Sequence, residues 1–197
     1  MNPERFIKQF LNGIREMPNH HDLELVLILT LYSGLRRAEL VQVKVEHVHD
    51  SGIEITEGKS DAALRTIPIL PILKPLVDHL VVNSQDGYLL PTQRTSKRFE
   101  DALGKRFGRI RRELGVDSEE INIHTLRHSF VNGCENAQIP EHLAKVLTGH
   151  SRGSITYGHY SPSNAVNWNV LEQAIDKVSF GKDTDGLAYG SVKAIVT

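Results

Sequence analysis

The stretch Gly34-Leu35-Arg36-Arg37-Ala38-Glu39-Leu40 directly follows an apolar run at residues 23–32. We expect it to open a helix that runs from about residue 35 to residue 46. An arginine in the first turn of a helix opposes the helix dipole, and its presence there is favoured when an anion binds beside it. Glu39 lies three residues beyond Arg36, so it can hold the guanidinium in place. An ordinary surface pair is the competing interpretation of this segment alone.

A second polar cluster lies in His124-Thr125-Leu126-Arg127-His128, on a helix that we predict over residues 124–135. His124, Arg127 and His128 share one face of that helix, where an arginine and a histidine one turn apart can contact a single phosphate. The two histidines also have the i, i+4 spacing of a zinc site, but no glutamate accompanies them as in H-E-x-x-H. Polar groups on a solvated face are the simplest interpretation.

His150 and two tyrosines complete the set of candidate residues. His150 falls just past a helix that we expect to begin at Pro140 and to end at Gly149. Tyr157 and Tyr160 follow shortly after it. A tyrosine in this place can equally be a packed side chain with its hydroxyl hydrogen-bonded.

Hydrophobic periodicity predicts a mainly α-helical chain with one small antiparallel β-sheet, an α+β fold. Residues 53–56 and 64–69 alternate as strands do, and Gly58, Ser60 and Asp61 between them favour a hairpin. The remaining predicted helices span residues 23–32, 72–82, 96–114 and 164–178, with Asp22 and Asn164 as caps of the first and last. We expect one domain over residues 1–180 and a flexible tail over residues 181–197.

Charge is distributed unevenly along the 197 residues. The formal net charge of −1 argues mildly against a nucleic-acid partner, but residues 94–112 hold eight basic side chains against two acidic ones. On the helix predicted over residues 96–114, an apolar stripe is flanked by a row of basic residues: Arg98, Lys105, Arg109 and Arg112. A solvated helix face is the simpler interpretation of this row, and a local field that attracts a polyanion is the functional one.

The sequence carries few signs of an extracellular or membrane location. Cys134 is its single cysteine, the N-terminus does not resemble a secretory signal, and the longest apolar stretch is too short to cross a bilayer. We therefore expect a cytoplasmic protein.

The order and spacing of these segments resemble the catalytic domain of the tyrosine recombinase (phage integrase) family. The resemblance rests on G-L-R-x-x-E-L, a lysine in a hairpin, H-x-L-R-H, G-H and a following tyrosine, and it covers residues 22–171. It implies a fold of the DNA breaking-rejoining type and site-specific recombination through a 3′-phosphotyrosyl intermediate. Family members also carry an N-terminal core-binding domain, and often an arm-binding domain, for which residues 1–21 leave no room.

The resemblance also implies a role for each candidate residue. Arg36 and Arg127 would bind the scissile phosphate, Lys59 would protonate the leaving oxygen, and Glu39 would support the site. His124 and His150 would contact phosphate oxygens or assist proton movement. Tyr160 would be the nucleophile, although the family usually places its tyrosine one residue earlier, where this chain has His159. Tyr157 is the alternative.

The same resemblance indicates the partners. It implies double-stranded DNA as the substrate, a tetramer on DNA in the full-length protein, and no metal, cofactor, membrane or small-molecule substrate. It suggests a bacterial or phage-encoded protein associated with the nucleoid. A type IB topoisomerase and a non-catalytic DNA-binding relative are the alternative functions, and a zinc hydrolase is a distant third.

Overall fold

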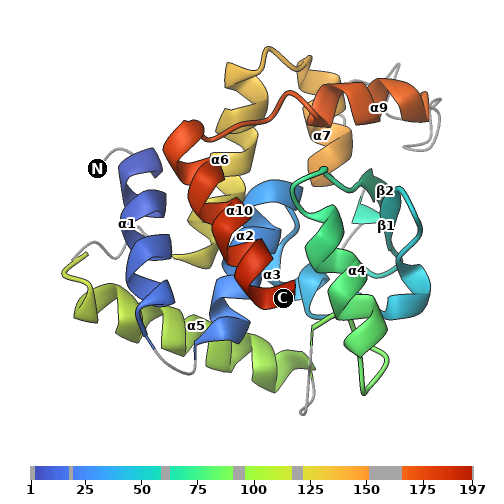
Figure 1. Ribbon diagram of the computed structural model, residues 1–197. Coiled ribbons are helices and arrows are strands. Elements are labelled where there is room, and N and C mark those ends of the chain that lie inside the picture. The colour runs from blue at the N-terminus through green and yellow to red at the C-terminus, as the bar shows by residue number, and fades with distance from the viewer. Residues whose placement is uncertain are drawn as a thin grey trace.

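The structure is a computed structural model that describes residues 3–17, 20–58, 63–90, 96–116, 122–150 and 166–196. Helices make up most of the molecule, and a two-stranded antiparallel sheet lies at one side of it (Figure 1). The helices and strands are α1 (Pro3–Arg15), α2 (His21–Ser33), α3 (Arg37–Leu40), the 3-10 helix η1 (Val45–His47), β1 (Gly52–Ile55), β2 (Arg65–Pro68), α4 (Lys74–Asn83), α5 (Ser96–Glu113), α6 (Ile123–Asn136), α7 (Glu141–Thr148), α9 (Trp168–Ile175) and α10 (Lys182–Val196).

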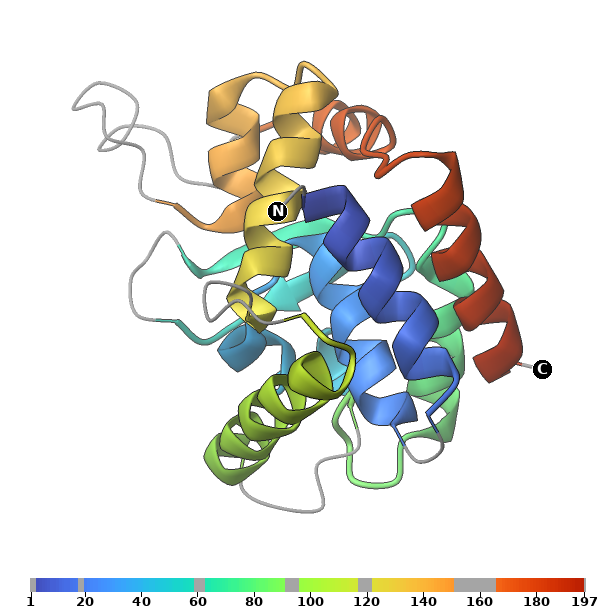
Figure 2. The same cartoon turned by 90° about the vertical axis from the view of Figure 1, so that its left-hand side faces the viewer.

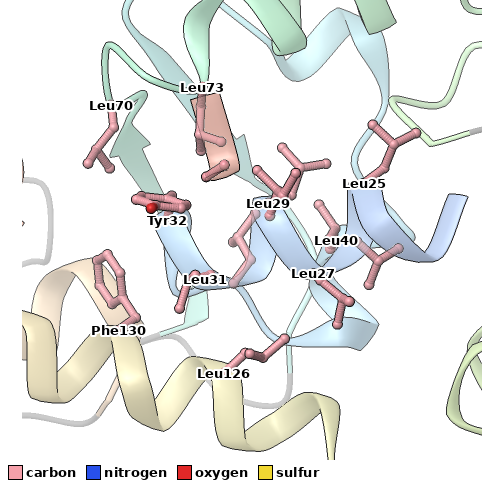
Figure 3. Close-up of a cluster of buried hydrophobic side chains, with 14 of the residues drawn as sticks. Leu25, Leu27, Leu29, Leu31, Tyr32, Leu40, Leu70, Leu73, Leu126 and Phe130 are labelled. Carbon is pink, nitrogen blue, oxygen red and sulfur yellow. The ribbon is translucent and has the colours of Figure 1, made fainter. Parts of the chain in front are cut away.

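Helix α2 lies at the centre of the molecule, as its almost uninterrupted apolar sequence requires. It contacts α1, α3, α5 and α6, and its leucines are buried among side chains from several of these elements (Figure 3). A helix that is apolar all round is stable in water only when other elements cover every face. The helix ends at Gly34, which adopts the left-handed conformation at φ 65°.

The two strands pair in antiparallel register, with Ile53 opposite Ile67 and Ile55 opposite Arg65. The predicted hairpin and the predicted mainly helical α+β class are thus confirmed. Within β2, Arg65 and Ile67 are both buried while Thr66 between them is partly exposed. Successive side chains of a strand point to opposite faces, so Arg65 enters the core beside Ile67.

The helix expected from residue 35 to residue 46 is wrong in length. Arg36 is extended (φ −69°, ψ 148°), and α3 covers only Arg37–Leu40. The backbone beyond it pairs with a later segment: Leu89 donates to the oxygen of Val43 at 2.8 Å, and Lys44 forms a bridge with Tyr88. Continuing the helix would break these long-range bonds, which local periodicity does not reveal.

The flexible tail expected after residue 180 is also wrong for the described residues, since Lys182–Val196 forms α10. This helix lies against α1 and α4 and buries Ala188 and Val192 (Figures 1 and 2). Its first turn is bound to α2, because the Tyr32 hydroxyl donates to Asp185 Oδ1 at 2.5 Å. Burial, followed by the hydrogen bond to Asp185, raises the pKa of Tyr32, so its hydroxyl stays protonated.

Helix α1, which periodicity did not predict, is amphipathic and covers the other side of α2. Phe6 and Phe10 pack against Phe107 of α5, and the Phe10 and Phe107 rings stack at 4.7 Å. Asp22, the predicted cap of α2, instead binds the Arg106 guanidinium of α5. Among the described residues, no helix combines the length and the apolarity that crossing a membrane requires.

Candidate functional site

The site forms where the end of α2, the start of α3, strand β2, helix α6 and the end of α7 meet. Gly34 makes this approach possible, because a Cβ atom there would lie 2.4 Å from Cδ1 of Phe130 on α6. Its left-handed φ of 65° also suits glycine best. The tight turn brings Arg36, two residues later, to the surface above α6 and α7.

Arg36 is held by its neighbour on α3 and by the end of α7. Its Nη1 donates to Glu39 Oε1 at 2.5 Å, and its backbone N–H donates to Glu39 Oε2 at 2.9 Å. Its Nη2 donates to the main-chain oxygen of Gly149 at 3.2 Å. The side chain stays 34% exposed, so the guanidinium is oriented by protein contacts yet open to an anion from solvent.

Arg127 is buried beneath this arginine, with a side-chain exposure of 2%. Its two terminal nitrogens donate to the main-chain oxygens of Gly34 and Thr148. Burial, and then the charge of Arg36, lower its pKa to about 10, which still leaves it charged at neutral pH. Arg127 therefore ties α6 to the turn after α2 and to the end of α7.

The C-terminal end of α7 is capped by three different arginines. At the Schellman-type turn that ends α7, the Gly149 N–H donates to the oxygen of Val146 and the His150 N–H donates to the oxygen of Lys145. The next three oxygens, which a helix end leaves without intrahelical donors, accept from guanidiniums. Leu147 accepts from Arg65 at 2.9 Å, Thr148 from Arg127, and Gly149 from Arg36 at 3.2 Å.

Glu39 is the carboxylate shared by the same three arginines. Besides Arg36, it accepts from Arg65 at 3.2 Å and 3.0 Å, and it lies 3.9 Å from Arg127 Nη1. Burial alone would raise its pKa, but the hydrogen bonds and charge of Arg65, followed by the bonds from Arg36, lower it. One ionised carboxylate thus faces three guanidiniums, which leaves the site with excess positive charge.

The histidines lie at the edge of this positive cluster. The rings of His124 and His128 meet edge to face at 4.7 Å. Burial, and then electrostatic interaction with His128 and Arg127, lower the pKa of His124. Both rings are exposed to solvent at their outer side, which is compatible with contact to a ligand.

The neighbours of His150 determine its tautomer. Its Nδ1 lies 2.9 Å from Thr148 Oγ1, whose own proton is donated to the oxygen of Ala144 at 2.6 Å. Nδ1 must therefore carry the proton, which leaves Nε2 as an acceptor in the neutral ring. Burial, and then the charges of Arg127, Arg36 and Arg65, lower the pKa of His150 and so favour this neutral form.

The structure brings together five of the predicted residues: Arg36, Glu39, His124, Arg127 and His150. Lys59, Tyr157 and Tyr160 lie outside the described residues. Within the described ranges, no group of three or more histidine, cysteine or acidic side chains is placed to hold a metal ion. Sequence reasoning missed Arg65, although its place two residues before Ile67 in an alternating strand points to a buried guanidinium.

The predicted basic row on α5 is exposed at all four positions: Arg98, Lys105, Arg109 and Arg112. Arg109 forms a long ion pair with Glu113, at 3.8 Å between Nε and Oε1, and both side chains are exposed to solvent. Helix α5 is joined to the site by Arg37, which donates to Glu100 at 3.0 Å and lies over Gly104. The basic row is therefore fixed relative to the neighbouring Arg36.

Comparison with known proteins gives a consistent family assignment. The sequence profile described as the phage integrase family matches residues 3–166. Tyrosine recombinase XerA of Pyrococcus furiosus is 29% identical over 147 residues, which are 73% of this chain and 51% of XerA. The chain therefore spans about half the length of this curated relative.

Solved structures show the same fold. The integrase from mycobacterium phage Brujita superimposes with a TM-score of 0.62 at 16% identity, over 91% of this chain and 61% of the integrase. The XerH site-specific recombinase, solved with a palindromic difH substrate in a post-cleavage complex, gives a TM-score of 0.55 at 22% identity. That match covers 88% of this chain and 51% of XerH.

Proposed function

Because this chain belongs to the phage integrase family, the tyrosine recombinases, we propose that it cleaves and rejoins DNA strands for site-specific recombination. The observation that carries the proposal is the convergence of Arg36 and Arg127 on the end of α7, where His150 follows directly. Three guanidiniums share one carboxylate there, so a phosphate diester supplies the missing negative charge.

Arg36 and Arg127 form the arginine clamp for the scissile phosphate. Arg36 is the more open of the two and meets the phosphate first. A guanidinium has five N–H donors, and the carbonyl bonds described above use two of those of Arg127. The other N–H groups of Arg127 donate to the phosphate. Preorganised donors of this kind stabilise the extra negative charge of a pentacoordinate phosphorus.

Tyr160 is the proposed nucleophile, on the strength of its place in the family pattern. A phenol with a pKa of about 10 is a weak nucleophile at neutral pH, so its proton must be accepted as it attacks. The free Nε2 of neutral His150 is suited to that role. The phenol oxygen bonds to phosphorus, the bond to the 5′ oxygen breaks, and Lys59 donates a proton to that oxygen, which leaves as a 5′-hydroxyl. Another strand's 5′-hydroxyl reverses the step.

The exposed basic row on α5 is the proposed contact with the DNA backbone. In such a contact the row orients the duplex without reading its base sequence, through Arg98, Lys105, Arg109 and Arg112. Double-stranded DNA is therefore the proposed partner, as a bound substrate is for XerH. A tetramer on DNA is proposed for the full-length protein, and the cytoplasm is its proposed location.

Covalent trapping on nicked duplexes tests this function. A library with a randomised duplex core carries a nick just 3′ of each candidate cleavage position, so that the short 5′-hydroxyl fragment diffuses away and cleavage becomes irreversible. We expect a protein–DNA adduct that survives denaturation without added metal, and peptide mapping should place the DNA on Tyr160. Absence of any adduct at protein concentrations that shift the duplexes in native gels would refute the proposal.

A further inference from the structure

Arg65 is the best-bonded side chain of the site, yet the chemistry proposed above does not use it. Its side chain is 1% exposed. Its Nε donates to Leu147 O at 2.9 Å, and its Nη1 to Ala63 O at 2.7 Å and Glu39 Oε1 at 3.2 Å. Its Nη2 donates to Glu39 Oε2 at 3.0 Å. Four of its five N–H groups are therefore bonded within the protein, against two for Arg127, so Arg65 has little left to offer a DNA strand.

A buried charge is a weak source of stability, because desolvation offsets most of its attraction to a partner. The destinations of its hydrogen bonds suggest another role for Arg65. Apart from Ala63, which lies two residues away on its own chain segment, its partners are Glu39 and the end of α7, the two parts of the protein that also hold the arginine clamp. Glu39 binds Arg36, and Leu147 O precedes the two oxygens that accept from Arg127 and Arg36.

The geometry of Glu39 explains what Arg65 does to the clamp. The two terminal nitrogens of Arg65 contact both carboxylate oxygens, which fixes the plane of the carboxylate. Without Arg65, the carboxylate would be free to turn fully onto Arg36 and Arg127, its two remaining cationic neighbours. The site would then hold two guanidiniums per carboxylate in place of three, and its positive potential would fall.

We propose that Arg65 is a positioning residue for strand cleavage: it holds Glu39 and the end of α7 so that the arginine clamp keeps its charge and geometry. The inference rests on the proposed function. Arg65 acts on the clamp through Glu39, to which both of its terminal nitrogens donate. Misplacement of a catalytic group by about 1 Å costs on the order of 100-fold in rate, so Arg65→Met should lower the cleavage rate by about 100-fold.

A purely structural arginine would give a different pattern. Loss of folding stability lowers the active fraction equally for every substrate, whereas a weakened clamp matters most for a charged phosphate. We therefore compare the trapped duplex with the same duplex carrying a neutral methylphosphonate at the scissile position. Arg65→Met should slow the phosphate substrate about tenfold more than the methylphosphonate, because a neutral centre needs less charge stabilisation.

Arg106→Met is the matched control. Arg106 also joins two elements through a carboxylate, Asp22, which lies at the far end of α2 from Gly34, about 18 Å along the helix axis. Its loss should change both substrates equally. Arg65→Lys keeps the charge but not the fork, so it should recover part of the rate. Arg65→Met combined with Glu39→Gln should be non-additive, since the two residues act as one unit.

The outcomes separate this inference from the function on which it rests. Failure of the unmodified chain to form any adduct would overturn the proposed function itself. Normal trapping by the unmodified chain, with equal slowing of both substrates by Arg65→Met, would overturn only the role of Arg65. If Arg65→Met does not fold, Arg65→Lys carries the same comparison, and an unchanged ratio of the two rates would again reject the inference.

Discussion

The Arg36 guanidinium donates to the main-chain oxygen of Gly149, which lies 113 residues further along the chain, at a distance of 3.2 Å. This bond places the exposed member of the arginine clamp next to His150. Since Glu39 accepts from the other terminal nitrogen of the same guanidinium, Arg36 has little freedom to turn away from the site.

Removal of Arg36 should lower the rate of strand cleavage far more than it lowers folding stability. Arg36→Ala deletes a partly exposed side chain, so we expect a stability loss of about 1 kcal/mol. The cleavage rate on a nicked duplex should fall about 100- to 1,000-fold, as for loss of one preorganised donor. Urea unfolding and single-turnover trapping measure the two effects. Arg37→Ala, which removes the adjacent arginine facing Glu100, is the control and should retain most cleavage.

Glu39 should make the stability of the protein depend on acid pH. Its folded-state pKa lies below its unfolded value, so its contribution is fully present above about pH 4.5 and is lost as pH falls through the folded pKa. Glu39→Gln should cost about 3 kcal/mol at pH 7, because it leaves buried guanidiniums without their counter-charge. It should also flatten the acid limb of the stability curve.

Urea unfolding at several pH values between 7 and 3 measures both effects. Glu141→Gln is the control, because Glu141 also pairs with a cation, Lys145 at 2.7 Å, but its side chain is 81% exposed. We expect no measurable change from that variant. An acid limb for Glu39→Gln as steep as that of the unmodified chain would contradict the assignment.

Much of the fold could be predicted because it is encoded locally. The apolar run of α2, the alternation around Ile53 and Ile67, and the stripe of α5 each need only neighbouring residues to be interpreted. The site could be predicted in part for a different reason: Arg36, Arg127 and His150 occur in an order that resembles a known family. Their hydrogen bonds to one helix end were not predictable from any single segment.

The features that escaped prediction depend on partners far away in sequence. Helix α3 stops at Leu40 because Val43 pairs with Leu89, and α10 forms because α1 and α4 cover its small apolar residues. Arg65 is buried because Glu39 and Leu147, distant in sequence, satisfy its donors. A local pattern cannot contain that information.

Docking of α10 should depend on Tyr32. Tyr32→Phe removes the hydroxyl that donates to Asp185, at a cost of about 1 to 2 kcal/mol, because a carboxylate that also accepts from Ser179 and the Phe180 N–H then loses one of its donors. Hydrogen exchange should accelerate in α10 before the other helices. Tyr189→Phe, at an exposed tyrosine of the same helix, should leave exchange unchanged. Equal protection of α10 in both variants would show that Tyr32 does not hold it.

The basic row on α5 should govern the salt dependence of DNA binding. Each phosphate contact contributes a slope of about −0.9 to the plot of log affinity against log salt concentration. Replacing Arg98, Lys105, Arg109 and Arg112 with alanine should therefore flatten the slope by about 3 to 4 for any duplex sequence. Fluorescence anisotropy over a salt series provides the measurement. Lys74→Ala, at an exposed lysine paired with Asp78 on α4, should leave the slope unchanged.

Covalent trapping can decide whether Tyr160 or Tyr157 is the nucleophile. The family pattern assigns the nucleophile to Tyr160, so Tyr160→Phe should reduce covalent trapping on a nicked duplex below detection, because phenylalanine has no hydroxyl to attack phosphorus. Tyr157→Phe should trap DNA at close to the normal rate, and it serves as the control for any disturbance of the same segment. A DNA adduct that persists in Tyr160→Phe and disappears in Tyr157→Phe would move the nucleophile to Tyr157. The clamp of Arg36 and Arg127 would keep its proposed role in either case, since whichever tyrosine is the nucleophile attacks the phosphate that the clamp binds.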